Sequence, residues 1–178
     1  KTNPFISYRA VEEELISCLY KMENNNKRFE ENNNNLFFGN VKFSEIKIFQ
    51  KNFSILKKVE NELTIIIKQA VKSDIFILDS FYNIFKDSNK CGIKWHTHLD
   101  DWDKSHGLQH QKYSLQYYLS MGDQTCSEPG IFKMSDPAKE ILQSKGMITI
   151  IPANRKHAAV YNGEIDRVML GINFYSLI

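Results

Sequence analysis

The second half of the chain consists of short runs rich in β-branched and aromatic residues, separated by turn signals such as "MGD", "SEPG" and "NGE". Such side chains favour strands, and clusters of Gly, Pro, Asn, Asp and Ser mark the turns between them. The predicted strands are Asp74–Phe85, Gly92–His98, Tyr113–Ser120, Gly130–Met134, Met147–Ile151, His157–Tyr161 and Arg167–Phe174, with a short helical turn at Pro137–Ser144. Short strands at this spacing are typical of a β-sandwich or jelly roll.

The first 73 residues have a helical and mixed character. One predicted helix spans "AVEEELISCLYKM", and a second spans Phe53–Lys72 with a wide apolar stripe. Between them, residues 23–35 form an Asn-rich loop with almost nothing to bury. We therefore expect one domain of residues 1–178, mainly β with N-terminal helices. Residues 74–178 form the jelly-roll core, and residues 1–73 supply helices that cover one sheet.

Composition narrows the classes of function. The chain has 178 residues, 42% hydrophobic and 25% charged, as in a soluble globular domain. A net charge of +2, with no Lys/Arg block, argues against nucleic acid as a partner. The longest apolar run has about five residues, against roughly 20 needed to span a bilayer, and the N-terminus lacks the apolar segment of a signal peptide. Three cysteines without paired spacing indicate reduced thiols and a cytoplasmic protein.

The segment Lys94–Lys104, "KWHTHLDDWDK", is unusually dense in imidazole and carboxylate groups. Because side chains alternate along a strand, His96, His98 and Asp100 project to one side if the strand continues. Both an H-x-H pair and an H-x-D pair are therefore available as metal ligands. A third ligand must come from elsewhere in the chain, and His157 is the candidate because a folded-back sheet brings its strand beside the first.

Two histidines and one carboxylate on one face of a metal leave three open positions, which is the facial triad of non-haem Fe(II) oxygenases. A structural zinc site is closed by four ligands, commonly including Cys, and Cys91 and Cys126 lack C-x-x-C spacing. Arg167 lies ten positions after His157 on the next predicted strand. An inward-facing Arg is costly to bury without an anionic partner, and a dicarboxylate supplies one.

The chain resembles the Fe(II)- and 2-oxoglutarate-dependent oxygenases, particularly their prolyl-hydroxylase-like branch. The resemblance covers roughly Asp74–Ile178 and rests on the ordered set of His98-Leu99-Asp100, "YSLQYYLS", "EPGIF", "GMITIIP" and "HAAVYNGEIDRVMLGINF". It implies a double-stranded β-helix with helices packed on one sheet.

The resemblance also implies roles for individual residues. Fe(II) is held by His98, Asp100 and His157, and the far carboxylate of 2-oxoglutarate is bound by Arg167 with Tyr118. His96 then lines the pocket mouth or touches substrate, and Trp102 is a candidate substrate wall. Tyr117 faces the opposite side of its strand from Tyr118.

The implied activity is hydroxylation of a small-molecule or peptide substrate, with decarboxylation of 2-oxoglutarate to succinate and CO₂. With a carboxylate in the iron site, hydroxylation is favoured over halogenation. One alternative is a cupin-type metalloprotein, because "HTH" and "GMITIIPANRKH" are similar to the two cupin motifs. That family needs a Glu shortly after H-x-H, for which Asp103 is the nearest substitute, and has no need for Arg167. A metallo-β-lactamase-like hydrolase requires a His where this chain has Asp101.

Overall fold

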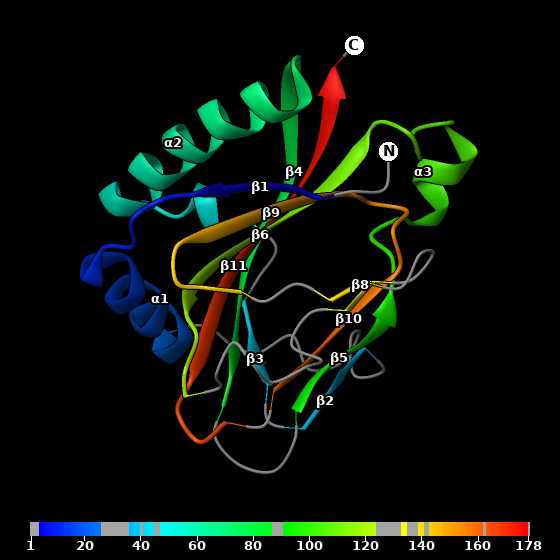
Figure 1. Cartoon of the computed structure of the whole chain (residues 1–178). Helices are drawn as coiled ribbons and strands as arrows, with labels where there is room; N and C mark the ends of the chain where they lie inside the picture. Colours follow the sequence, from blue (N-terminus) through cyan, green and yellow to red (C-terminus); the bar gives the residue numbers. More distant parts are fainter. Residues whose placement is uncertain are drawn as a thin grey trace.

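The computed structural model describes residues 4–25, 36–39, 41–44, 47–86, 91–123, 133–134, 139–140, 143–161 and 163–177. Two antiparallel sheets dominate these residues (Figure 1). The large sheet has the order β1 (Phe5–Tyr8), β9 (Met147–Pro152), β6 (Lys112–Ser120), β11 (Arg167–Leu177), β4 (Asp74–Phe85) and β3 (Val41–Phe43). The small sheet has the order β2 (Phe37–Phe38), β5 (Cys91–His96), β10 (His157–Tyr161), β7 (Lys133–Met134) and β8 (Lys139–Glu140).

From β4 onward the chain crosses repeatedly between the two sheets. Strands β4, β6, β9 and β11 belong to the large sheet, and β5, β7, β8 and β10 belong to the small one. This alternation winds the chain around a common interior, as in a jelly roll, and confirms the predicted double-stranded β-helix.

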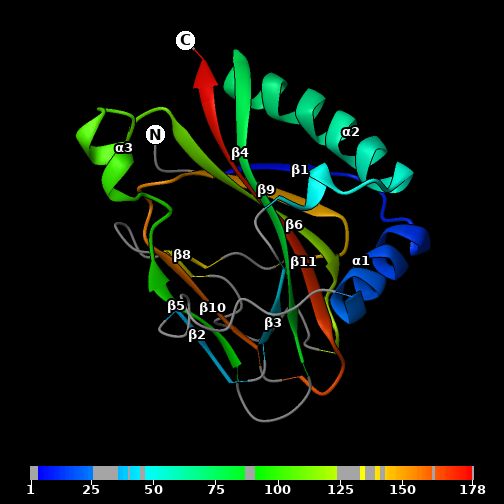
Figure 2. The same cartoon turned by 180° about the vertical axis from the view of Figure 1, so that it is seen from behind.

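Two helices, α1 (Glu13–Asn25) and α2 (Ser54–Val71), cover the outer face of the large sheet (Figure 2). Their apolar stripes supply Leu15, Leu19, Met22, Leu56, Val59, Leu63 and Ile67, which pack against Ile84, Leu115, Tyr117, Ile148, Leu170 and Ile172 of the sheet. Burial of these faces is the main stabilisation of such amphipathic helices. The predicted helices and their packing on one sheet are therefore confirmed.

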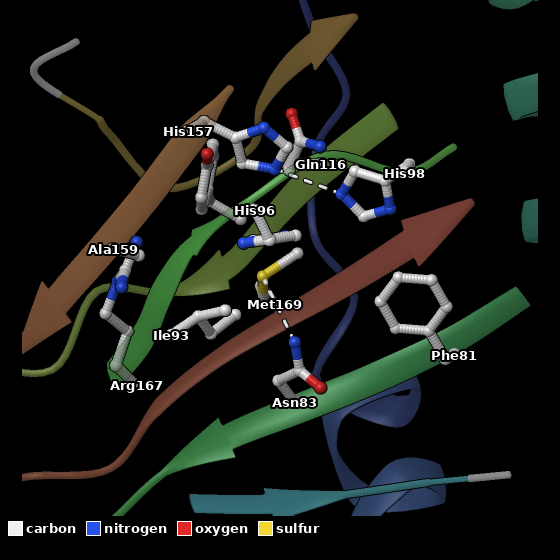
Figure 3. Close-up of a pocket in the computed structure, with 11 residues that line it drawn as sticks. Phe81, Asn83, Ile93, His96, His98, Gln116, His157, Ala159, Arg167 and Met169 are labelled. Atoms are coloured by element: carbon white, nitrogen blue, oxygen red, sulfur yellow. Dashed lines mark hydrogen bonds between the residues drawn. The ribbon is translucent and has the colours of Figure 1, made fainter. Parts of the chain in front are cut away.

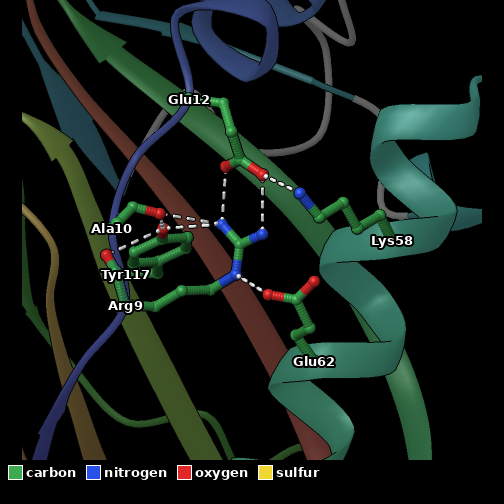
Figure 4. A network of polar contacts seen from close by, with 6 residues as sticks. All are labelled: Arg9, Ala10, Glu12, Lys58, Glu62 and Tyr117. Atoms are coloured by element: carbon green, nitrogen blue, oxygen red, sulfur yellow. Dashed lines mark hydrogen bonds and ion pairs between the residues drawn. The ribbon is translucent and has the colours of Figure 1, made fainter.

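A network around Arg9 ties the segment before α1 to the rest of this layer (Figure 4). Its guanidinium donates to both carboxylate oxygens of Glu12, to Glu62 of α2 and to the hydroxyl of Tyr117 in β6. Lys58 adds a second cation 3.2 Å from Glu12. Arg9 is thus a buried cation whose donors are well matched by acceptors.

A second apolar cluster lies on the opposite face of the large sheet, toward the small sheet. It comprises Val41, Phe85, Cys91, Ile93, Tyr118, Met147, Ile151, Tyr161 and Met169. Gly92 lets β5 approach β10 closely, because a Cβ there would lie 2.1 Å from the carbonyl oxygen of Ala159. The pairing of β5 with β10 places His96 directly opposite His157.

Several predicted boundaries differ from the observed ones. Strand β5 ends at His96, two residues before its predicted end, because the chain turns there toward the short helix α3 (Asp101–Ser105). The predicted helical turn Pro137–Ser144 is wrong in its described part, since Lys139–Glu140 pair with β7 as a strand. Residues 23–25 of the predicted Asn-rich loop belong to α1 instead. The other residues of the predicted turn before Gln143, and residues 26–35 and 130–132, lie outside the described part of the chain.

The N-terminal 73 residues also contribute more strands than their helical appearance indicated. Strand β1 pairs with β9, β3 pairs with β4, and β2 pairs with β5. Among the described residues, no helix is both long enough and apolar enough to cross a membrane.

Candidate active site

Three imidazoles converge at one end of the cavity between the sheets (Figure 3). They belong to His96 at the end of β5, His98 two residues later and His157 at the start of β10. One ring nitrogen of each lies within 4.8 Å of the others, and the Nε2 atoms of His98 and His157 are 3.0 Å apart. The main-chain N–H of His98 donates to the carbonyl of Ala153, which holds this loop against the end of β9.

All three imidazoles are neutral near pH 7. Burial lowers the pKa of His96, and burial together with the neighbouring His157 lowers the pKa of His98 well below its usual value. Burial lowers the pKa of His157 to about 3. Neutral imidazole is the form that ligates metals, so the cluster is ready to bind a cation without first losing protons.

Asp100, the carboxylate predicted to complete the metal site, lies outside this cluster. Because the strand stops at His96, the expected alternation of side chains does not reach Asp100. Its carboxylate instead accepts a hydrogen bond from the main-chain N–H of Asp103 and caps α3. The side chain is 61% exposed. The structure thus brings His98 and His157 together as predicted, with His96 as their neighbour in place of Asp100.

A buried ion pair fixes α3 beneath this loop. Asp103 is fully buried, its carboxylate lies 2.7 Å from Nζ of Lys112, and it also accepts a hydrogen bond from the hydroxyl of Tyr175. Burial alone would raise the pKa of Asp103, but the hydrogen bonds from Lys112 and Tyr175 lower it to about 2. Lys112 lies in β6 and Tyr175 in β11, so these contacts anchor α3 to both strands.

The side chain of Arg167 occupies the other end of the same cavity and is 1% exposed. One Nη atom donates to Gln143 at 2.7 Å, whereas Nε and the second Nη have no hydrogen-bond partner among the described residues. The guanidinium lies over the rings of Phe85 and Tyr118. No carboxylate of the described residues pairs with it, so this buried cation requires an anion from outside the described chain.

Tyr118 lies beside Arg167 and is also buried. Its hydroxyl meets hydrogen-bond geometry with none of the described residues, although the side chains of Thr149 and Gln143 lie near it. Burial raises the pKa of Tyr118, so the hydroxyl keeps its proton and is available as a donor. Arg167 and Tyr118 together present unused donors to the cavity, which fits an anionic ligand such as a carboxylate.

A second cavity of about 170 Å³ adjoins the histidines on the side away from Arg167. It is lined by Leu36, Phe37, Phe43, Ser44, Phe81, Asn83, Ile93, His96, His98 and Asn173. The rings of Phe37 and Phe43 are stacked with centroids 4.6 Å apart. His96 and His98 therefore line both cavities, an inner one that also holds the Arg167 side chain and an outer one with largely apolar walls.

Trp102, predicted as a possible substrate wall, lines neither cavity. It is 62% exposed on α3 and stacks on the ring of His106. Conversely, the sequence did not single out Gln143, Asn83 or Asn173. Each is a buried amide in a segment whose pattern looks like an ordinary loop or strand. Asn83 and Asn173 draw attention only because they line a cavity, and Gln143 only because it accepts a hydrogen bond from Arg167.

Comparison with solved structures identifies the fold. HygX from Streptomyces hygroscopicus, with nickel and 2-oxoglutarate bound, is similar with a TM-score of 0.70 at 10% identity, over 99% of this chain and 84% of that one. A prolyl hydroxylase from Trichoplax adhaerens, in complex with a hypoxia-inducible factor peptide fragment, gives 0.68 at 10% identity over 99% and 84%. A viral collagen prolyl hydroxylase from Paramecium bursaria Chlorella virus-1 gives 0.63 at 12% identity over 98% and 96%.

No protein-family model matches the chain, and no curated protein matches it by sequence. The structural likeness therefore establishes the fold, which is the double-stranded β-helix of the 2-oxoglutarate- and Fe(II)-dependent oxygenases, prolyl hydroxylases included. This likeness does not favour the cupin alternative.

Proposed function

We propose that the protein is an Fe(II)- and 2-oxoglutarate-dependent dioxygenase that hydroxylates a small-molecule or peptide substrate and forms succinate and CO₂. The observation that carries this proposal is Arg167, a buried cation without a described anionic partner, in the same cavity as three converging imidazoles. A dicarboxylate such as 2-oxoglutarate needs a metal ion for its chelating end and a cation for its far carboxylate. This cavity contains residues suited to both tasks.

His98 and His157 would hold the metal together with a third protein ligand. When bound, Fe(II) with 2-oxoglutarate and O₂ supplies the oxidising chemistry, and the protein supplies binding, orientation and exclusion of water. Imidazole ligands with open positions suit non-haem iron. The burial of both rings keeps them neutral and free of competing protons.

Arg167 would pair with the far carboxylate of 2-oxoglutarate, and the Tyr118 hydroxyl would donate to the same group. The guanidinium presents two unused donor nitrogens, and a carboxylate accepts from Arg through two parallel hydrogen bonds. The rings of Phe85 and Tyr118 flank the guanidinium and keep water away from the pair. In a water-poor site such a charge pair is stronger than at the surface.

The outer cavity would receive the substrate. Apart from the two histidines, its described walls carry no ionisable group, and three Phe rings contribute to them. The amide oxygens of Asn83 and Asn173 have no hydrogen-bond partner among the described residues. These walls suit a neutral group with apolar surface that donates one or two hydrogen bonds. Two solved structures of this fold contain different ligands, hygromycin B in HygX and a peptide fragment in the Trichoplax enzyme.

We also propose a cytoplasmic location for the protein and a substrate other than nucleic acid. The thiols of Cys18 and Cys91 are buried and free, and burial raises the pKa of each, which agrees with a reducing, cytoplasmic location. The net charge of +2 argues against nucleic acid as the substrate.

An anaerobic titration tests the proposal. Fe(II) and then 2-oxoglutarate are added to the metal-free protein, and the visible charge-transfer band of the chelate is recorded. We expect the band in the wild-type protein and its loss in His157→Ala. Succinate release in air, measured without added substrate, gives a second readout. Metal binding without any band on addition of 2-oxoglutarate would contradict the assignment of Arg167.

A further inference from the structure

We propose that the metal is held by three imidazoles, those of His96, His98 and His157, and that Asp100 is a helix cap and not a ligand. This inference rests on the proposed function, since it concerns the metal site of that enzyme. It departs from the two-histidine, one-carboxylate pattern that the H-x-D reading of the sequence implied.

The spacing of the His98 and His157 ring nitrogens fits a common metal ion, and His96 is close enough to join it after a small side-chain shift. The Nε2 atoms of His98 and His157 are 3.0 Å apart, and a ring nitrogen of His96 lies within 4.8 Å of both. Two imidazole ligands at right angles, each roughly 2.1 Å from a metal, have nitrogens about 3.0 Å apart. The 3.0 Å separation is therefore that of neighbouring ligands in an octahedral site.

The outer nitrogens of two rings are held in the orientation that metal ligation requires. Nδ1 of His157 lies 2.8 Å from the carbonyl oxygen of Arg155, and Nδ1 of His96 lies 2.7 Å from that of Lys94. A carbonyl oxygen only accepts, so both Nδ1 atoms carry the proton and both Nε2 atoms present a lone pair. A main-chain carbonyl in this position is a usual orienting partner of a metal-bound His.

The fold supplies His96 for a topological reason. His96 ends β5 directly opposite His157 in β10, one register shift away from the pairing of Ala159 with Ile93, and β5 approaches β10 closely at Gly92. His98 then enters from the loop, fixed by its main-chain bond to Ala153. The H-x-H pair is thus the pair that faces His157, whereas residue 100 already belongs to the next element.

Asp100 is committed to other contacts. Asp100 and Asp103 form a reciprocal capping box, in which each carboxylate accepts from the other residue's main-chain N–H. The second carboxylate oxygen of Asp100 lies 4.0 Å from Nζ of Lys112. Turning Asp100 toward the histidines would give up the capping hydrogen bond from the main-chain N–H of Asp103.

The ligand set changes the charge at the metal. With two histidines and one carboxylate as ligands, a divalent metal site has a net charge of +1. With three neutral imidazoles the net charge stays at +2. The doubly charged centre attracts anionic ligands more strongly, so the chelating end of a 2-oxo acid is favoured at the open positions. Arg167 at the far end of the cavity draws the other carboxylate.

Metal affinity separates the two ligand sets. Co(II) is titrated into metal-free wild-type protein, His96→Ala and Asp100→Asn, and binding is followed by visible absorption and calorimetry. Asn is as good an N-cap as Asp, so Asp100→Asn removes the carboxylate while it keeps α3. We expect the Kd for Co(II) to rise at least about tenfold in His96→Ala and to stay within about twofold in Asp100→Asn.

A count of imidazoles gives an independent readout. Pulsed electron paramagnetic resonance of bound Cu(II) should report three imidazoles in the wild type and Asp100→Asn, and two in His96→Ala. Should His96→Ala fail to fold by circular dichroism, His96→Gln takes its place. Weaker Co(II) binding in Asp100→Asn with normal binding in His96→Ala would overturn the proposal, as would a wild-type count of two. Co(II) bound by three imidazoles but unresponsive to 2-oxoglutarate would instead count against the proposed function.

Discussion

Tyr117 and Tyr118 are neighbours in β6, yet their hydroxyl groups serve opposite faces of the large sheet. Tyr117 belongs to the core beneath the helices and bonds with Arg9, whereas Tyr118 belongs to the core between the sheets and lies beside Arg167. Strand alternation alone separates them by face. One Tyr is therefore bound into the fold, and the other has a hydroxyl free of described partners.

The two tyrosines form a matched pair of variants. Tyr118→Phe should raise the Kd for 2-oxoglutarate about tenfold, because a hydrogen bond to a charged carboxylate is worth about 1.5–3 kcal/mol. It should leave the urea midpoint of the ligand-free protein unchanged. Tyr117→Phe should lower the free energy of unfolding by about 1–3 kcal/mol, because it removes the hydroxyl that donates to the buried main-chain carbonyl of Arg9 and accepts from its guanidinium, and should leave the Kd unchanged. Calorimetry and urea titration measure both, and a reversed pattern would refute the two assignments.

Replacement of Arg167, unlike that of most buried residues, should not lower the stability of the protein. Arg167→Met removes a buried cation that lacks a described counter-ion, so the unfolding midpoint of the ligand-free protein should not fall. Its affinity for 2-oxoglutarate should be lost while Co(II) binding remains. Arg9→Met is the control, because it removes a buried cation that is bonded to Glu12, Glu62 and Tyr117, leaves Glu12 with Lys58 alone, and should lower the unfolding midpoint. Strong destabilisation by Arg167→Met would indicate an internal counter-ion.

The Arg9 network should contribute an acid-labile part of the stability. The hydrogen bond from Arg9 lowers the pKa of Glu12 from 4.5 to about 2. A lowered carboxyl pKa stabilises the folded state fully above pH 4.5, and this contribution is lost as the pH falls toward 2. Glu12→Gln should therefore reduce the slope of unfolding free energy against pH between these values. Parallel slopes in urea titrations of wild type and variant would contradict this.

The buried Asp103–Lys112 pair should be necessary for folding. Asp103→Asn leaves the charge of Lys112, which is 3% exposed, without its closest partner, at a cost of about 3–5 kcal/mol. Asp101→Asn, on the exposed side of the same helix, should change stability by less than about 0.5 kcal/mol. Thermal or urea unfolding of the two variants tests the contrast, and equal stabilities would show that the pair contributes little.

Much of the architecture could be predicted from local pattern. Runs of β-branched residues located β4, β6, β9, β10 and β11 within a few residues, and apolar periodicity located both helices. The spacing of His157 and Arg167 also predicted that both residues lie on strands, and these strands line one cavity. These features depend on side-chain alternation and burial, which the local sequence pattern encodes.

The ligand set of the proposed metal site could not be predicted in the same way. The sequence by itself determined that "HTHLD" offers two ligand pairs, because alternation makes His96, His98 and Asp100 equivalent while the strand lasts. Only the tertiary structure favours one pair over the other: β5 ends at His96, and Asp100 gains a capping box while His96 gains His157 across the sheet. Where a strand ends depends on its neighbours, and here those are β10 and the Asp103–Lys112 pair.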